Sequence, residues 1–198
     1  MIIGVTGNIA SGKTEVAKLL KQKLGGIVIN ADRVAHELYA PHTPVWQSVV
    51  RTFGKEILKK NTQEIKRNVL GSMVFHDSAK MKALENIVHP FVVKDIKKRI
   101  ATLQKKTPAM PIILEAVKLL DSKLLDLVDK VCFVSTTKEI QIARLLAKDV
   151  SMEEALARID SYKASPNHPK ITLSIENSKG LKALEHLVDK KIPQLLAI

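Results

Sequence analysis

The fold of this chain is decided by residues 7–14. They read Gly7-Asn8-Ile9-Ala10-Ser11-Gly12-Lys13-Thr14 and match the pattern G-x-x-x-x-G-K-S/T in full. The apolar stretch Ile2 to Val5 precedes the motif, and apolar residues at helical spacing follow it. A glycine-rich turn between a buried strand and a helix directs backbone N–H groups into one concavity that binds phosphate oxygens. The alternative is a plain glycine-rich turn with an exposed lysine, but motif and context together favour a nucleotide-binding loop.

Individual residues of this loop have expected tasks in binding the nucleotide. Lys13 would reach the β- and γ-phosphates, and the hydroxyl of Thr14 would hold Mg²⁺. Glu15 suits the positive end of the helix dipole but places a negative charge close to a polyanion. The predicted ATP-binding residues of this segment are Asn8, Ile9, Ala10, Ser11, Gly12, Lys13, Thr14 and Glu15.

Outside the loop, short apolar runs alternate with helical stretches. Five runs read as buried strands: Ile2 to Val5, Ile27 to Ile29, Pro111 to Leu114, Val131 to Val134 and, more weakly, Ile171 to Ile175. Strands that are apolar throughout and separated by helices predict an α/β fold with a parallel sheet covered on both faces. Residues 31–107 carry no strong strand, and we expect them to form a helical lobe between the second and third strands.

Prolines give the clearest signals for helix boundaries. Thr43 followed by Pro44 predicts a capped helix start. A later helix should be interrupted or restarted at His89–Pro90, because proline removes a backbone donor and clashes with the preceding turn. For the same reason, the last helix should end or kink near Pro193.

The composition is that of a folded globular protein. Of 198 residues, 45% are hydrophobic and 26% charged, which excludes a wholly disordered chain. No run approaches about 18 uncharged apolar residues, and the first residues lack a signal-peptide pattern, so we expect no membrane span and no secretion. The single cysteine, Cys132, has no partner for a disulfide or a Cys-x-x-Cys site, which favours a cytoplasmic location.

The charge of the chain is strongly positive. Lys and Arg number 32 against 20 Asp and Glu, a formal net charge of +12. Such a chain attracts nucleic acid, anionic lipid or phosphorylated small molecules, although a solvated surface explains the charge equally well. Only 4% of residues are aromatic, and they are not interleaved with basic ones, which argues against a stacking surface for nucleic acid.

Two carboxylates follow predicted strands on the edge that carries the phosphate loop. Ligands of open parallel sheets bind beyond the carboxyl ends of the strands. Asp32 follows the second strand and is positioned either to accept the proton of an attacking hydroxyl or to cap the next helix. Glu115 ends the third strand, where it either orders a metal-bound water or caps a helix.

Basic residues after the fourth strand are candidates for phosphate contacts. Arg144 and Lys148 are four residues apart, which places two cations on one face of the expected helix. Cations that close over a transferring phosphoryl group stabilise its charge, whereas without the phosphate loop a solvated basic face would be the better interpretation. His89 alone fits a structural histidine better than a catalyst.

A longer set of motifs occurs in order along the chain. Its members are the phosphate loop, Asn30-Ala31-Asp32 with Ala35-His36-Glu37-Leu38, Phe53-Gly54, Arg67 to Leu70 to Val74-Phe75, Leu84-Glu85 with His89-Pro90, Pro111 to Glu115, Gln141 to Arg144, and Ile175-Glu176-Asn177. This set resembles the dephospho-coenzyme A kinase family over nearly the whole chain. The phosphate loop is common to many ATPases, while His89-Pro90 and Pro111 to Glu115 at these separations are much more specific.

The resemblance implies an activity and an architecture. The activity is transfer of the γ-phosphoryl group of ATP to the ribose 3′-hydroxyl of dephospho-coenzyme A, the last step of coenzyme A synthesis. The architecture is a single domain with a three-layer P-loop kinase fold and five parallel strands. Its core comprises residues 1–30, 108–136 and 171–198, its helical acceptor-substrate lobe residues 31–107 and its lid residues 137–170. ATP, Mg²⁺ and dephospho-coenzyme A are the implied ligands; neither nucleic acid nor membrane is an expected partner, and the oligomeric state stays open.

The resemblance also assigns roles residue by residue. Asp32 becomes the general base, with Lys13 and Arg144 as further catalytic residues. Arg144 and Lys148 belong to the lid, and Asn177 with Lys179 to the adenine side of the ATP site. The implied substrate-binding residues are Asp32, Arg67, His89, Pro90 and Glu115, and the implied metal ligand is Thr14.

The chain departs from the family pattern at several positions. The family usually has aspartate at Asn30, glycine at Asn8 and Ala10, a hydroxyl residue at Glu15, arginine at Lys148 and glutamine near Tyr162. Lysine keeps the charge of arginine but lacks the planar fork that grips two phosphate oxygens. These changes bear on catalytic efficiency and acceptor identity more than on the fold.

Two other functions compete with this interpretation. One is a different small-molecule P-loop kinase, acting for example on a nucleoside monophosphate. The other is a non-catalytic nucleotide- or nucleic-acid-binding protein that uses the positive charge. A guanine-reading Asn-Lys-x-Asp segment is absent from the sequence, which argues against a GTPase switch.

Overall fold

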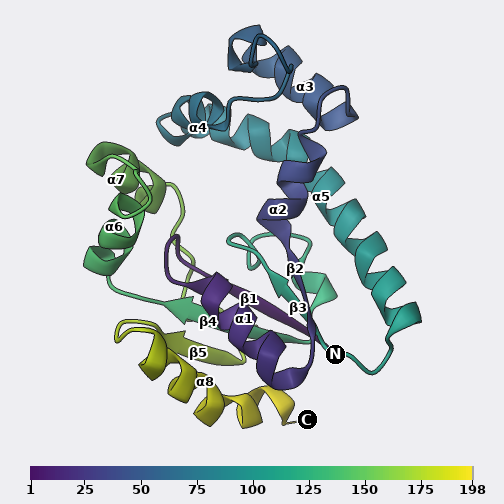
Figure 1. Cartoon of the computed structure of the whole chain (residues 1–198), viewed down its shortest axis with the longest axis vertical. Coiled ribbons are helices and arrows are strands. Elements are labelled where there is room, and N and C mark those ends of the chain that lie inside the picture. Colours follow the sequence, from purple (N-terminus) through teal and green to yellow (C-terminus); the bar gives the residue numbers. More distant parts are fainter. Residues whose placement is uncertain (198) are drawn as a thin grey trace. The chain divides into compact units, whose positions relative to one another are not determined.

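The computed structural model describes residues 1–197 and contains a five-stranded parallel sheet (Figure 1). The strands are β1 (Ile2–Gly7), β2 (Ile27–Asn30), β3 (Ile112–Glu115), β4 (Lys130–Ser135) and β5 (Leu173–Glu176). Their order is β2-β3-β1-β4-β5, and every neighbouring pair is parallel. The predicted α/β class and the five-stranded parallel sheet are therefore confirmed.

Helices follow β1, β2, β4 and β5, whereas β3 is joined to β4 by a segment with only a 3-10 turn. The helices are α1 (Lys13–Leu24), α2 (Ala31–Leu38), α3 (Pro44–Phe53), α4 (Arg67–Phe75), α5 (Ser78–Lys106), α6 (Lys138–Leu146), α7 (Met152–Asp160) and α8 (Leu181–Leu196), with 3-10 turns at η1 (Lys55–Ile57) and η2 (Leu125–Leu127). Thr43 caps α3 as predicted, because its hydroxyl accepts a hydrogen bond from the backbone N–H of Trp46. Among residues 1–197, no helix combines the length and the apolar character needed to cross a bilayer.

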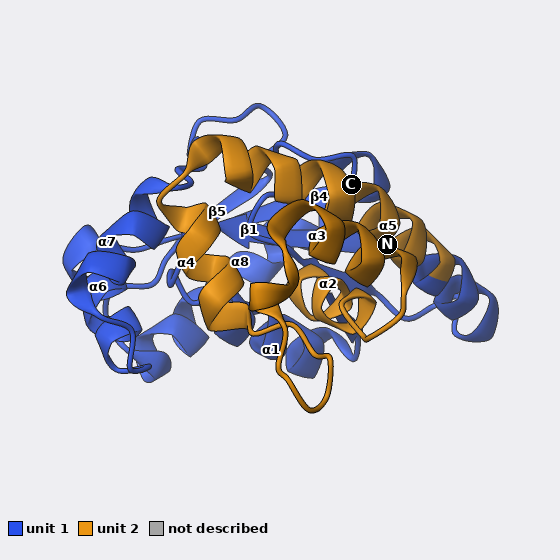
Figure 2. Cartoon of the chain, turned by 90° about the horizontal axis from the view of Figure 1, so that it is seen from above, with its two compact units in different colours: residues 1–30, 99–198 blue, residues 31–98 orange. Residues whose placement is uncertain are grey.

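The chain divides into two compact units (Figure 2). The first unit comprises residues 1–30 and the chain from Arg99 onward, and it contains all five strands. The second unit, residues 31–98, is helical apart from an isolated antiparallel bridge between Leu58 and Ile65. The functional division into a core, an acceptor lobe at 31–107 and a lid at 137–170 stays a prediction.

Alternating side chains of the strands cover both faces of the sheet. On one face, Val5, Cys132 and Ile175 pack with Leu20 of α1 and Val188 of α8 in a continuous core. Burial raises the pKa of the Cys132 thiol to about 12, so this residue is an apolar filler and not a reactive thiol. On the other face, Gly4 of β1 lies against Leu119 and Val128, and the Thr6 hydroxyl donates to the Val117 carbonyl at 2.9 Å. Burial of both faces explains why the strands are apolar throughout.

The prediction that a helix is interrupted or restarted at Pro90 was wrong, whereas the last helix does end near Pro193, at Leu196. Helix α5 continues through Pro90, and α8 continues past Pro193 to Leu196. Buried residues at helical spacing explain why α5 continues, since Val88, Val92 and Ile96 form one stripe across the proline. In α8, Leu195 is fully buried beyond Pro193. In both cases burial outweighs the loss of one backbone hydrogen bond.

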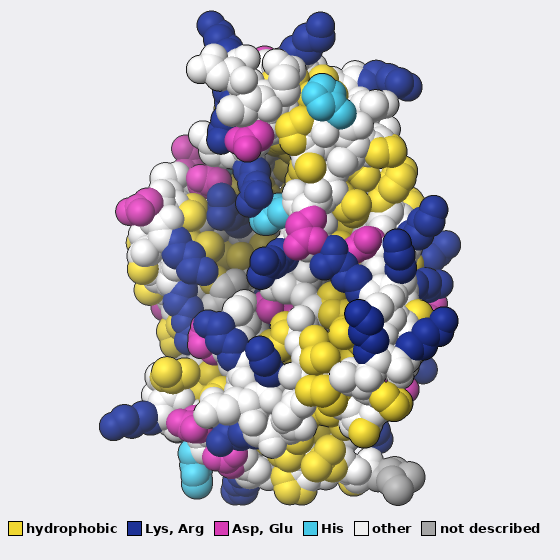
Figure 3. Space-filling view, turned by 45° about the vertical axis from the view of Figure 1, so that its right-hand side comes forward, with side chains coloured by type: hydrophobic (Ala, Val, Ile, Leu, Met, Phe, Trp, Pro, Cys, Tyr) yellow, Lys and Arg dark blue, Asp and Glu magenta, His cyan; other side chains and the backbone are white. Residues whose placement is uncertain are grey.

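The surface is rich in basic side chains. Lysine and arginine are numerous on the face shown in Figure 3, consistent with the formal net charge of +12. Some are paired: Lys23 lies 2.6 Å from a carboxylate oxygen of Asp189, and Lys59 lies 2.7 Å from one of Glu64. Exposed pairs of this kind contribute about 1 kcal/mol or less, so the apolar core and not the surface charge holds the fold.

Two glycines provide a matched test of how the sheet controls the start of the phosphate loop. Gly7 has φ 142°, and a Cβ there would lie 1.9 Å from the carbonyl oxygen of Val134, its neighbour on β4. Gly25 ends α1 with φ 67°, and a Cβ there would meet nothing within 4 Å. We expect Gly7→Ala to lower the free energy of unfolding by about 3 kcal/mol or more, because backbone must move. Gly25→Ala should cost only about 1 kcal/mol of left-handed strain. Urea denaturation measures both, and equal losses would contradict this assignment.

Candidate active site

The phosphate loop connects β1 to α1 at the carboxyl edge of the sheet. Three of its residues have positive φ: 142° at Gly7, 57° at Ala10 and 94° at Gly12, the residue preceding α1. Such left-handed positions fold a short loop into a concave nest of backbone N–H groups, in front of the positive end of a helix.

The carbonyl groups of this loop are held from outside by side chains of distant residues. Gln141 of α6 donates from Nε2 to the Ile9 carbonyl at 2.5 Å. Arg144, also on α6, donates from Nη1 to the carbonyls of Ala10 at 3.1 Å and Ser11 at 2.9 Å. Asn177, which follows β5, donates from Nδ2 to the Ser11 carbonyl at 2.9 Å.

These contacts fix the direction of the loop amides. Across a trans peptide bond, the C=O of one residue and the N–H of the next point in opposite directions, and the described chain contains no cis peptide bond. When Gln141, Arg144 and Asn177 hold the carbonyls of residues 9–11, the N–H groups of Ala10 and Gly12 are turned away from these side chains, while the N–H of Ser11 donates to the Asn8 carbonyl at 3.2 Å. The loop is therefore shaped to bind an anion before any ligand arrives.

Lys13 is folded over the loop that it terminates. Its side-chain Nζ donates to the carbonyls of Gly7 at 3.2 Å and Asn8 at 2.8 Å. The residue is only 6% exposed, although lysine is rarely buried. A buried ammonium group attached to a nest of amides adds a full positive charge to the anion site.

Glu115 connects the sheet to the phosphate loop. Strand register places it beside Asn30 of β2 and Val5 of β1. One carboxylate oxygen accepts from the Thr14 hydroxyl at 2.6 Å, and the other accepts from Asn30 Nδ2 at 2.7 Å. Of the two roles predicted for Glu115, these contacts favour a place beside the Thr14 hydroxyl over a helix cap.

Arg144 and Lys148 do not share a helix face, which corrects the sequence-based expectation. Helix α6 ends at Leu146, and the backbone N–H groups of Lys148 and Asp149 bond three residues back, to Leu145 and Leu146. This tighter turn and the positive φ of Asp149, 59°, end the helix before Lys148, whose side chain is exposed. Arg144 instead faces the phosphate loop, and its Nη2 also donates to the Asn177 carbonyl at 3.0 Å.

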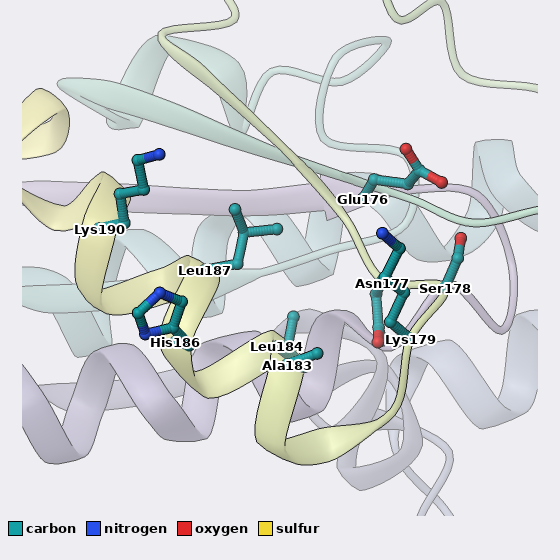
Figure 4. Close-up of a pocket in the computed structure, with 9 residues that line it drawn as sticks. All are labelled: Glu176, Asn177, Ser178, Lys179, Ala183, Leu184, His186, Leu187 and Lys190. Carbon is teal, nitrogen blue, oxygen red and sulfur yellow. The ribbon is translucent and has the colours of Figure 1, made fainter.

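The segment after β5 lines a pocket of about 330 Å³ (Figure 4). Both residues predicted for the adenine side, Asn177 and Lys179, line this pocket, together with residues of α8 that include Leu184 and Leu187. Asn177 is 5% exposed and its amide is engaged with the phosphate loop, so it ties the pocket wall to the loop.

Glu15 is less unfavourable beside a phosphate site than the sequence suggests. Its carboxylate lies 2.8 Å from the ammonium group of Lys18, one turn further along α1. The pair keeps the local charge of the helix start close to neutral. Because both side chains are exposed, solvent screens the attraction between them, and the ion pair contributes little to stability.

The acceptor-side residues Asp32, Arg67, His89 and Pro90 all belong to the second unit. Asp32 lies in the first turn of α2, after the position of a capping residue, which weakens the capping interpretation. Arg67 donates to His36 Nδ1 at 3.1 Å, because guanidinium has no acceptor. Burial and the Arg67 charge lower the pKa of His36, which keeps it neutral and able to accept this bond.

Sequence comparison identifies the family. A profile described as dephospho-CoA kinase matches residues 1–182. A dephospho-CoA kinase of Carboxydothermus hydrogenoformans is 40% identical over 186 residues, which cover 92% of this chain and 88% of the relative. The chain belongs to the dephospho-CoA kinase family.

Solved structures agree with this membership. The protein TT1252 from Thermus thermophilus superimposes with a TM-score of 0.76 and 28% identity, covering 100% of this chain and 98% of that one. A dephospho-CoA kinase from Campylobacter jejuni has a TM-score of 0.59 and 26% identity, covering 98% and 96%. The predicted P-loop kinase fold and the family resemblance are thus both confirmed.

Several residues that shape the site had no predicted role. Gln141 holds the Ile9 carbonyl, Asn30 holds Glu115, and the backbone N–H of Ala164 donates to Asn8 Oδ1 at 3.0 Å. The three-residue spacing of Gln141 and Arg144 on a helix was a usable signal, since such residues share a face. The contact between Ala164 and Asn8 had no such signal in the sequence, because it joins two residues that are 156 positions apart.

The lysine of the loop gives the first test of this site. Lys13→Ala should weaken nucleotide binding and lower kcat/KM for ATP by about 10²-fold or more, because an electrostatic partner of the phosphates is lost. The fold should persist, as judged by circular dichroism. Lys21→Ala, which removes an exposed lysine from the last turn of the same helix, is the matched control and should bind nucleotide like the wild type. Wild-type kinetics of the Lys13 variant would overturn the assignment of the loop.

Proposed function

We propose that this chain transfers the γ-phosphoryl group of ATP to the ribose 3′-hydroxyl of dephospho-coenzyme A, which gives coenzyme A. The observation that carries the proposal is the family match over residues 1–182, in a chain whose phosphate loop has the required geometry. The reaction is the last step of coenzyme A biosynthesis. We place it in the cytoplasm, where ATP is available to small-molecule kinases.

The polyphosphate of ATP binds the loop amides and Lys13. Amides already directed into one concavity bind phosphate oxygens without having to reorganise when the ligand arrives. Such preorganised donors are the main source of electrostatic catalysis. Arg144 adds a positive charge directly behind the loop, held there by three carbonyl groups. The adenine ring occupies the pocket beside Asn177 and Lys179, and Lys148 in the proposed lid supplies a further cation.

Thr14 and Glu115 have the chemistry of a magnesium site. A hydroxyl and a carboxylate are the oxygen donors that Mg²⁺ prefers, and these two oxygens lie 2.6 Å apart. When bound, the ion neutralises charge on the β- and γ-phosphates. Thr14 would hold it directly, and Glu115 would order a water in its shell while Asn30 fixes the carboxylate from the other side.

The acceptor hydroxyl is activated by Asp32. An alcohol attacks poorly until its proton finds a base, and a carboxylate in the first turn of α2 offers one. Arg67, His89 and Pro90 contribute to binding dephospho-coenzyme A. The bond between Arg67 and His36 holds the guanidinium in place on its own unit.

A direct assay tests this function. The protein is incubated with Mg-ATP and dephospho-coenzyme A, and coenzyme A is detected by mass. A panel of nucleoside monophosphates distinguishes another small-molecule kinase, and the salt dependence of binding to DNA or RNA distinguishes a nucleic-acid binder. Turnover of a monophosphate in place of dephospho-coenzyme A would refute the assigned acceptor.

The variant Asp32→Asn tests whether Asp32 acts as the general base or has only a structural role. Asparagine keeps the shape but cannot take the proton, so kcat should fall by about 10²–10⁴-fold while ADP affinity and melting temperature change little. Asp77→Asn is the matched control, because Asp77 caps α5 through the backbone N–H groups of Ala79 and Lys80. Asparagine caps helices about as well, so this control should keep full activity. Near-normal kcat for the Asp32 variant would remove it from the mechanism.

Lys148→Arg tests whether the proposed lid favours a planar cation. Guanidinium binds two phosphate oxygens at once, so turnover should rise while ATP affinity stays nearly unchanged. Lys138→Arg at the start of α6 makes the same chemical change at an exposed position and should have no effect. A Lys148 variant slower than the wild type would show that the surroundings are adapted to lysine.

A further inference from the structure

Gln141 is a buried polar residue on the side of α6 that faces the phosphate loop. It is 5% exposed, and its Nε2 donates to the Ile9 carbonyl at 2.5 Å. Arg144, one turn further along the same helix, holds the next two carbonyls of the loop. Together they form a row of donors that follows the loop backbone residue by residue. Gln141 holds the first carbonyl of that row.

The peptide held by Gln141 is the one whose orientation most needs support. It joins Ile9 to Ala10, and Ala10 has φ 57°. An L-residue adopts this left-handed conformation at a cost of about 1 kcal/mol or more, so an unsupported peptide tends to relax. With the Ile9 carbonyl fixed on α6, the N–H of Ala10 points to the opposite side. That side is the concavity where phosphate is expected to bind.

We propose that Gln141 is a positioning residue that aims the Ala10 N–H at the polyphosphate of the nucleotide. This inference rests on the proposed nucleotide site and adds to it a residue with no assigned role. It makes α6 part of the phosphate site without any contact between Gln141 and the nucleotide. If this is so, removing the Gln141 donor weakens phosphate binding by the Ala10 N–H, although Gln141 itself does not touch the phosphate.

Two variants of similar size test this role. Gln141→Met keeps the length of the side chain and has no donor, and Gln141→Glu replaces the donor by an oxygen that repels the Ile9 carbonyl. Glu139→Met on the exposed face of α6 is the matched control. Dissociation constants for Mg-ADP and for inorganic tripolyphosphate are measured by calorimetry well below the melting temperature of each variant.

We expect both Gln141 variants to bind ADP and tripolyphosphate about tenfold more weakly, the glutamate variant more so, with KM for dephospho-coenzyme A unchanged. The Glu139 control should match the wild type. If the glutamate variant fails to fold, the methionine variant, which buries no charge, carries the test. Folded variants with wild-type dissociation constants would overturn the inference, as would a failure of both to fold, which would make Gln141 a stability residue.

These probes also separate this inference from the proposed function. Neither ADP nor tripolyphosphate binding requires the acceptor, so an error in the assigned acceptor leaves the expected result unchanged. A wild-type protein that binds neither probe would overturn the nucleotide site and this inference with it.

Discussion

The phosphate loop depends on hydrogen bonds made on its outer side. A loop that binds phosphate with backbone amides must direct those amides inward, and planar trans peptides achieve this only when the carbonyls are directed outward. Here the outward carbonyls of residues 9–11 are held by side chains from α6 and from the segment after β5. The backbone of the loop is thus held by elements that follow it by more than 120 residues.

Strand register supplies the second half of the site. Because β3 lies between β1 and β2, its last residue, Glu115, is placed next to both the phosphate loop and Asn30. The carboxylate can therefore accept from Thr14 with one oxygen and from Asn30 with the other. A neutral amide at position 30 gives Glu115 a donor in place of a second negative charge. The sheet thereby orients the one group on β3 that the proposed magnesium site requires.

Local sequence patterns predicted the sheet, the phosphate loop and most helices, because apolar strands and the glycine motif depend on neighbouring residues alone. They failed where burial by distant residues decides the outcome. Pro90 lies in a continuous helix because residues such as Ile96 are buried beyond it. Lys148 lies outside α6 because the helix tightens at its end. The spacing of Gln141 and Arg144 indicates a shared helix face, but the contacts of Gln141 and Asn177 with the loop are decided by tertiary structure.

Ala10 shows how this loop tolerates a residue where the family pattern has glycine. Its left-handed backbone costs about 1 kcal/mol that glycine would avoid. Its methyl group, however, packs with Ile9 against a small core formed by Leu145, Ala155 and Ile159 of α6 and α7. Glycine would relieve the strain and lose this contact. Alanine therefore accepts some backbone strain and in return makes an apolar contact between the loop and helices α6 and α7. This contact adds to the hydrogen bonds from Gln141 and Arg144. Attachment through both apolar and polar contacts makes the position of α6 and the shape of the phosphate loop mutually dependent.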